Sequence, residues 1–146
     1  MQVQQIMTTD PACCSPEAGL VEIAKMMASN DCGEIPVLDE GSRPVGVVTD
    51  RDIVCRVVAE GKDAKQMNAR DIMTSPVVTV RPEDSLQDCR TKMEQSQIRR
   101  VPVVDENGVC CGMISQADIA RAASEHDIAE LLRDVSQPSS PPAQAG

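Results

Sequence analysis

The chain has 146 residues, a formal net charge of -9 and no phenylalanine, tyrosine or tryptophan. This length fits one compact domain or two very small ones. The negative charge, with no run of Lys and Arg, argues against a nucleic-acid partner and against binding to an anionic membrane. Without aromatic residues, the core must be aliphatic, with eight methionines filling its gaps.

The first residues carry no recognisable targeting signal. Met-Gln-Val-Gln-Gln lacks the basic and apolar regions of a signal peptide. No uninterrupted apolar stretch approaches the length needed to span a membrane. We therefore expect a cytoplasmic protein.

Seven cysteines form an odd set without a Cys-x-x-Cys pair, and the chain has one histidine, His126. These spacings do not favour a metal site, so we expect none and interpret most of the cysteines as small apolar core residues. In Cys13-Cys14 and Cys110-Cys111, strand alternation would turn one thiol outward. The sequence therefore leaves open the alternative that one of these thiols is exposed and redox-reactive.

An internal repeat dominates the sequence. Ile6-Met7-Thr8 recurs as Ile72-Met73-Thr74, and the stretch 46–53 recurs at the same spacing as 112–119. The protein is therefore two tandem copies of one unit. A unit of about 60 residues is marginal for an independent core. We therefore expect the two halves to pack on each other.

The first unit is assigned to residues 1–61, where 3–11 form a lead-in turn. Leu20, Ile23, Ala24 and Met27 have the spacing of an amphipathic helix. A hairpin of two strands follows, and a second helix ends near Gly61. The predicted order is strand, helix, strand, strand, helix, at 12–15, 18–30, 34–39, 44–49 and 50–61.

The second unit, residues 69–123, follows a polar linker at 62–68 and repeats this order. Its strands and helices are predicted at 77–80, 85–96, 99–105, 109–115 and 116–123. The fold class is α/β (α+β): each unit has a short mixed sheet with helices on one face.

Residues beyond the repeat indicate one more helix and a tail. Ser124 to Asp127 form a possible cap, and an amphipathic helix is predicted over 124–135. Its apolar stripe could pack on its own domain or serve self-association, and both alternatives stay open; the stripe consists of Ile128, Leu131, Leu132 and Val135. Residues 136–146 are rich in Pro, Ser, Gln, Ala and Gly, which predicts disorder.

The repeated stretch 46–53 contains the candidate binding residues. In each copy a buried strand leads directly into a helix, with Thr49 and Asp52 at the first junction and Ser115 and Asp118 at the second. Backbone N–H groups at a helix start favour an anionic ligand, and a carboxylate suits the paired hydroxyls of a ribose. The same residues also make a capping box, in which both side chains only satisfy helical N–H groups.

Taken together, these motifs resemble a pair of CBS domains, known as a Bateman module. The likeness covers residues 3–123 and rests on the two Ile-Met-Thr segments, on Ile35-Pro36-Val37 and Val101-Pro102-Val103, and on the two Thr/Ser-x-x-Asp stretches. The chain is similar to small stand-alone bacterial CBS-pair proteins.

The resemblance implies two units packed about a pseudo-twofold axis, with two clefts for adenosyl ligands: AMP, ADP, ATP, NAD or S-adenosylmethionine. In this family the aspartate, here Asp52 or Asp118, holds the ribose, and the hydroxyl residue, Thr49 or Ser115, faces phosphate. The adenine would be contacted by residues of the first strands and of the two Pro-Val strands, for which the candidates are Ala12, Cys13, Ile35, Pro36, Val77, Val78, Val101 and Pro102.

Charged residues distinguish the two copies. Arg99 and Arg100 stand where the first unit has Gly33 and Glu34, and Arg51 lies inside the first motif. A desolvated phosphate needs a cation, so the three arginines are candidate phosphate ligands. Glu34 would repel a phosphate, so we predict that the site at Ser115 and Asp118 is the stronger, unless Arg51 turns into the first cleft.

These observations predict a regulatory module that senses adenine nucleotides and signals to a protein partner. It is not expected to be an enzyme or to carry a catalytic cofactor, because the sequence has no nucleophile elbow, phosphate loop or metal cluster. A homodimer is expected, with Ile53 and Val57 on the contact face. The alternative is an interaction scaffold with vestigial nucleotide sites that acts through its C-terminal helix.

Overall fold

A computed structural model describes residues 1–136 of the chain, apart from the side chains of 127, 128, 130, 131 and 134–136. The predicted disordered tail, 136–146, lies outside the described residues except for Ser136, which ends the last helix. Of the predicted apolar stripe, only the side chain of Leu132 is described.

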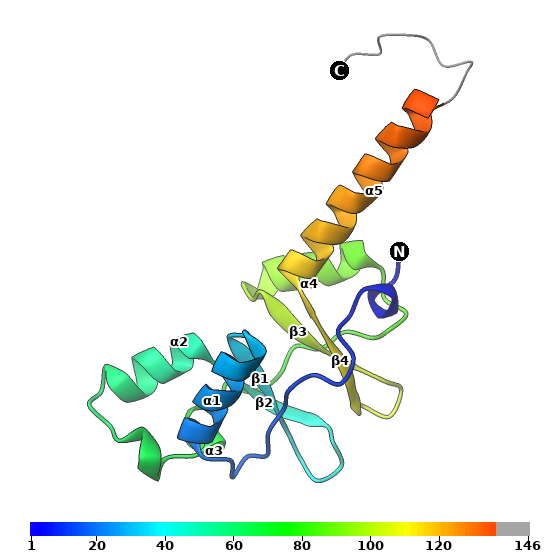
Figure 1. Cartoon of the computed structure of the whole chain (residues 1–146). Helices are drawn as coiled ribbons and strands as arrows, with labels where there is room; N and C mark the ends of the chain where they lie inside the picture. Colours follow the sequence, from blue (N-terminus) through cyan, green and yellow to red (C-terminus); the bar gives the residue numbers. More distant parts are fainter. Residues whose placement is uncertain (137–146) are drawn as a thin grey trace.

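The chain folds into short helices and two hairpins, in the order shown in Figure 1. The elements are η1 (Val3–Gln5), α1 (Leu20–Asn30), β1 (Glu34–Leu38), β2 (Pro44–Thr49), α2 (Asp50–Ile53), η2 (Val54–Val58), η3 (Ala64–Gln66), α3 (Ala69–Ile72), α4 (Leu86–Ser96), β3 (Arg100–Val104), β4 (Cys110–Ser115) and α5 (Gln116–Ser136). The predicted mixed α/β class with two similar units is confirmed.

Each unit contains one antiparallel hairpin, β1 with β2 and β3 with β4, and the two hairpins have the same register and the same irregularity. The strands predicted at 12–15 and 77–80 are only single parallel bridges, Cys14 to Val37 and Val80 to Val103. Prolines flank both segments, and proline cannot donate to a strand ladder. The mixed sheet is therefore present in each unit, but its third strand is minimal.

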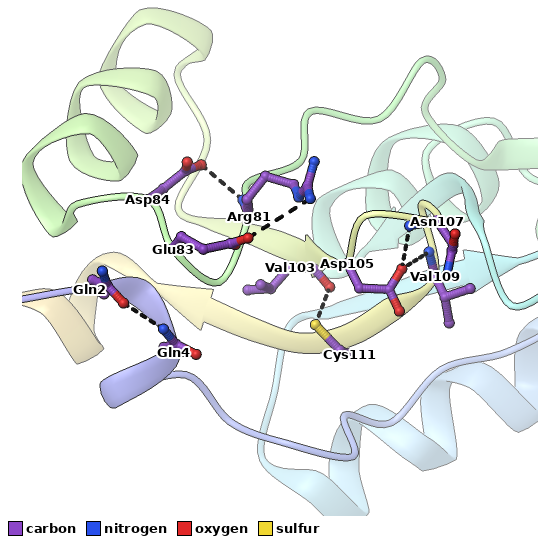
Figure 2. A network of polar contacts seen from close by, with 10 residues as sticks. All are labelled: Gln2, Gln4, Arg81, Glu83, Asp84, Val103, Asp105, Asn107, Val109 and Cys111. Carbon is purple, nitrogen blue, oxygen red and sulfur yellow. Dashed lines mark hydrogen bonds and ion pairs between the residues drawn. The ribbon is translucent and has the colours of Figure 1, made fainter.

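An aspartate holds the turn of each hairpin. Oδ1 of Asp105 accepts hydrogen bonds from the backbone N–H groups of Asn107, at 2.8 Å, and Val109, at 3.0 Å, as Figure 2 shows. Oδ1 of Asp39 does the same for Gly41 and Arg43, at 2.9 and 3.0 Å. The repeated aspartate thus fixes the turn that sets the register of both hairpins.

The hydrophobic residues form two cores that do not follow the order of the sequence. Ala69 and Ile72, from the start of the second repeat, are buried with Leu20 and Ile35 in the first core. Val3, from the start of the first repeat, is buried in the second core. The lead-in segments have therefore changed places, and each one closes the core of the other unit.

Backbone hydrogen bonds fix this exchange. Thr8 and Met113 bond to each other through N–H to O distances of 2.8 and 2.9 Å, and Val47 and Thr74 do so at 3.1 and 2.9 Å. The two segments thus extend the β4 and β2 edges, respectively. The expectation that the halves pack on each other is met through these crossed segments.

Two predicted helices differ from the structure. No new cap forms at Ser124: α5 continues from Gln116 to Ser136 as one helix, because the alanine-rich stretch 120–123 favours uninterrupted helix. In Figure 1, α5 projects away from the rest of the molecule. The helix predicted over 50–61 ends earlier, and its second half, η2, is a π-helical turn.

The face predicted for self-association is also corrected. Val57 is 1% exposed and belongs to the first core, so Ile53 and Val57 do not form an outward apolar pair. The exposed apolar residues of this segment are Val54 and Val58, at 57% and 67%. Within the part of the chain that the structure describes, no helix has the length and apolar character needed to cross a bilayer.

Candidate functional site: a cleft between the repeats

The first motif forms where β2 passes directly into α2. The Thr49 hydroxyl accepts a hydrogen bond from the backbone N–H of Asp52 at 3.0 Å, and Oδ2 of Asp52 accepts one from the backbone N–H of Thr49 at 3.0 Å. This is a capping box. The second oxygen of Asp52, Oδ1, lies 3.9 Å from Nε of Arg56.

The second motif repeats this geometry between β4 and α5. Ser115 Oγ and Asp118 Oδ2 make the reciprocal capping bonds, at 3.1 and 3.0 Å. Here the remaining oxygen, Oδ1 of Asp118, accepts a hydrogen bond from the guanidinium of Arg121. Both carboxylates are therefore structural caps, and Asp52 has the less occupied second oxygen.

A cleft of about 800 Å³ lies at the start of α2 and brings the two repeats together. Four of the predicted site residues line it: Thr49 and Arg51 from the first repeat, and Arg99 and Arg100 from the second. The other lining residues are Gly33, Glu34, Asp50, Gln97 and Ile98.

Local structure explains this convergence. Asp31 and Gln97 adopt left-handed conformations, with φ of 49° and 55°, and end α1 and α4. The chain then turns into β1 and β3, which start at Glu34 and Arg100. In the two hairpins, Glu34 pairs with Thr49 and Arg100 pairs with Ser115. Both strand starts therefore present a charged residue beside a motif hydroxyl.

Glu34 has an unusual environment in this cleft. Burial raises the pKa of its carboxyl from 4.5 to about 7; Arg100 acts in the opposite direction, and Asp52 adds to the increase. Its Oε2 atom is buried and has no hydrogen-bond partner. A buried carboxyl oxygen without a hydrogen-bond partner costs free energy. A ligand group that donates a hydrogen bond to Glu34 would therefore be stabilised.

The three arginines of the cleft are also uncommitted. Among the described residues, no carboxylate forms an ion pair with Arg51, Arg99 or Arg100, whereas six pairs form elsewhere. Their guanidinium groups are donors suited to carboxylates and phosphates. The cleft can therefore bind an anionic group.

Several predicted site residues lie elsewhere. Ile35 and Val101 are 0% exposed in the two cores, and Pro36 and Pro102 are buried beside them. Contact of these four residues with a ligand stays a prediction. Asp52, Ser115 and Asp118 are half-buried and do not line this cleft. The first-strand candidates Ala12, Cys13, Val77 and Val78 remain accessible but do not line this cleft.

Sequence reasoning missed four residues of the cleft: Gly33, Asp50, Gln97 and Ile98. One signal could have found them, because Gly33-Glu34 and Arg99-Arg100 occupy the same place in the repeat. A Cβ at Gly33 would lie 2.8 Å from Oδ2 of Asp50, so the Asp50 carboxylate would have to move. Asp50 N donates to the Gly33 carbonyl at 2.9 Å, which ties β1 to the start of α2.

The seven cysteines are spread over both repeats. All seven are free, and no cluster of three or more potential metal ligands occurs among the described residues. Burial raises the pKa of Cys14 and of Cys89 to about 11, which disfavours the reactive thiolate. Cys13 and Cys55 are the exposed members.

Comparisons with known proteins agree with this architecture. CBS domain-containing protein YhcV of Bacillus subtilis is 38% identical to this chain over 118 residues, which are 81% of this chain and 82% of that protein. Hypoxic response protein 1 of Mycobacterium tuberculosis is 32% identical over 135 residues, which are 92% of this chain and 94% of that protein.

A solved structure is similar in fold. The CBS domain pair of protein MJ0100, in complex with methylthioadenosine and S-adenosyl-L-methionine, superposes with a TM-score of 0.78 and 26% identity, covering 86% of this chain and 98% of that one. The family model of the CBS domain matches residues 3–59 and again 69–125. The chain therefore belongs to the CBS-domain family and contains a tandem pair of these domains.

Proposed function

We propose that this chain is a regulatory module that binds an adenosyl ligand reversibly between its two CBS domains and signals to a protein partner. The observation that supports this is the shared cleft, in which Thr49 and Arg51 of one repeat meet Arg99 and Arg100 of the other. The MJ0100 pair, of similar fold, was solved with adenosyl ligands.

Each residue has a role in this proposal. The arginines attract the anionic group of the ligand, and the Thr49 hydroxyl offers a further hydrogen bond. The helix cap uses Oδ2 of Asp52, so Oδ1 accepts hydrogen bonds from the ribose hydroxyls. No residue is assigned a catalytic role, since binding changes only the shape or assembly of the module.

The test is titration calorimetry of the purified chain with AMP, ADP, ATP, NAD and S-adenosylmethionine. We expect at least one ligand to bind with a dissociation constant well below about 1 mM. A dissociation constant of about 1 mM corresponds to a binding free energy of only about 4 kcal/mol. If none binds below millimolar concentration, the sensor function is lost.

We further propose a homodimer. The supporting observation is the apolar surface of η2, where Val54 and Val58 are 57% and 67% exposed and stand one helical turn apart. Covering exposed apolar area is worth about 25 cal/mol per Å². A second chain that packs on this surface would remove both valines from water.

The extended α5 supports the alternative, an interaction scaffold. This helix continues past the second repeat to Ser136 and projects from the body of the molecule (Figure 1). A projecting helix can offer a face to a partner. The calorimetric titration separates the two functions, because a scaffold with vestigial sites would bind no adenosyl ligand.

A further inference from the structure

Cations without an ion pair and a carboxyl with an unpartnered, buried oxygen line the same cleft. Arg51, Arg99 and Arg100 are cations without an ion-pair partner among the described residues, and Glu34 holds a buried Oε2 atom without a hydrogen-bond partner. Although Arg100 is close enough to act on the charge of Glu34, the two form no ion pair. The cleft therefore offers a separate acceptor and separate cations.

A ligand that carries only phosphate satisfies half of this arrangement. Phosphate oxygens can accept from the arginines, but a fully ionised phosphate has no proton to offer Glu34. Its negative charge would also lie near Glu34 and Asp50, the two carboxyls of the lining. Like charges in a partly desolvated cleft oppose binding, and the opposition grows with each phosphate.

A zwitterionic ligand satisfies both halves. A carboxylate suits the fork of an arginine guanidinium, while an ammonium group supplies several donors for a carboxylate such as Glu34. S-adenosylmethionine has a carboxylate, an ammonium and a sulfonium on one adenosyl scaffold. Methylthioadenosine has the same scaffold without the amino-acid part, and is therefore the matched ligand that lacks these charges.

We propose that Glu34 is a specificity-determining residue that makes the cleft prefer adenosyl ligands with a zwitterionic amino-acid group over adenine nucleotides with phosphates. This inference rests on the proposed function, since it presumes that an adenosyl ligand binds between the repeats. It assigns the ligand class from one carboxyl of the first repeat and the arginines of both.

The protonation of Glu34 gives the proposal a second readout. The groups that face Glu34 are Asp50, Asp52 and Arg51 from the start of α2, and Arg99 and Arg100 from the start of β3. With its pKa raised to about 7, Glu34 is charged above that pH and neutral below it. The preference for the zwitterion is therefore greatest at alkaline pH and smaller in acid.

The experiment is calorimetric titration of S-adenosylmethionine, methylthioadenosine and AMP into the full chain, at a pH above and a pH below 7. The variants are Glu34→Gln, which keeps the size of the side chain, and Glu106→Gln, which removes a charge from an exposed hairpin turn. In Glu34→Gln at alkaline pH, the affinity ratio of S-adenosylmethionine to AMP should fall by about tenfold or more.

The remaining arms identify the cause. Methylthioadenosine affinity should stay within about twofold in both variants, and Glu106→Gln should leave the ratio unchanged. Arg100→Gln should lower the affinity for both AMP and S-adenosylmethionine, because each has an anionic group for the arginines. Unchanged methylthioadenosine affinity shows that a variant is folded. If ligands bind but Glu34→Gln leaves the ratio unchanged, this inference fails and the proposed function survives. If no adenosyl ligand binds, both fail.

Discussion

Asp52 and Asp118 illustrate how one residue can serve both a fold and a site. In each residue Oδ2 accepts a hydrogen bond in a capping box, so the prediction that the motif caps a helix is confirmed. The two residues differ at their other oxygen. Oδ1 of Asp118 accepts a hydrogen bond from Arg121, whereas Oδ1 of Asp52 lies 3.9 Å from Arg56. The sequence ranked the Ser115 site higher, whereas this geometry favours the first.

Replacing Asp52 should therefore weaken ligand binding more than replacing Asp118. We expect Asp52→Ala to lower the affinity for an adenosyl ligand by about tenfold or more. The control is Asp71→Ala, because Asp71 makes the same kind of cap, accepting from Asn68 N at 2.9 Å, but, unlike Asp52, is not the chain neighbour of a cleft-lining residue. Each change should cost about 1 kcal/mol of stability. Calorimetry in which only Asp118→Ala weakens binding would restore the original ranking.

Glu34 should also affect the pH dependence of stability. Its pKa is raised on folding from 4.5 to about 7, so the native state holds a proton that the unfolded state has lost. Stability contributed by this group is full below about pH 4.5 and falls as the pH rises through 7.

Glu34→Gln should remove this loss. We expect the variant to be more stable than the parent by about 2 kcal/mol above pH 7, less than the full shift would give because part of the side chain still meets water. At acid pH, where the parent carboxyl is protonated, the two should be equal. Urea denaturation at both pH values measures the difference, and an equal difference at both would show that charge is not its cause.

At the level of elements, the crossed lead-in segments decide how the repeats pack. Gly46 and Gly112 sit where these segments meet β2 and β4. A Cβ at Gly112 would lie 2.9 Å from the backbone oxygen of Thr8, whereas at Gly46 its nearest neighbours are side-chain atoms of Met73. Methionine can move aside more easily than a backbone carbonyl.

Gly112→Ala should therefore destabilise the protein more than Gly46→Ala does. We expect about 1 to 3 kcal/mol for Gly112→Ala, from overpacking against a backbone that cannot shift. Gly19→Ala is the control, since nothing lies within 4 Å of a Cβ there. Thermal denaturation gives the order, and equal effects at 112 and 46 would show that the backbone neighbour of Gly112 is not the cause of the difference.

Local patterns predicted most of the elements, and the failures have physical causes. The hairpins and the first helices follow from alternation and from the 3.6-residue period. The continuous α5 was missed because Ser124 is a good cap only when the helix begins there. The exchange of Ile72 and Val3 between cores was missed because a buried position in a pattern does not tell which core buries it. The role of Glu34 depended on that same long-range packing.

At the level of the whole molecule, the cleft exists because two marginal units complete each other. Neither repeat alone supplies both Thr49 and Arg100, so the proposed ligand binding would be linked to the packing of the repeats. A ligand that binds only the packed state stabilises it by mass action. In the proposed function, this linkage is the physical means by which binding changes the form that a partner meets.

The proposed homodimer would bury the exposed valines of η2. We expect sedimentation equilibrium to give twice the 15.7 kDa of one chain. Placing charges at Val54 and Val58 should reduce the mass to that of one chain, since burying an unpaired carboxylate opposes association. Val21→Asp, at a site that is 37% exposed on α1, serves as the control. A single-chain mass for the unaltered protein would contradict the dimer.

The most direct test of the central proposal is a crystal structure of the chain with S-adenosylmethionine. We expect the ligand in the cleft between the repeats, with its ribose hydroxyls at Oδ1 of Asp52 and its charged end between Glu34 and the arginines at 99 and 100. A ligand bound outside this cleft, or a cleft left empty at millimolar ligand, would contradict the proposal.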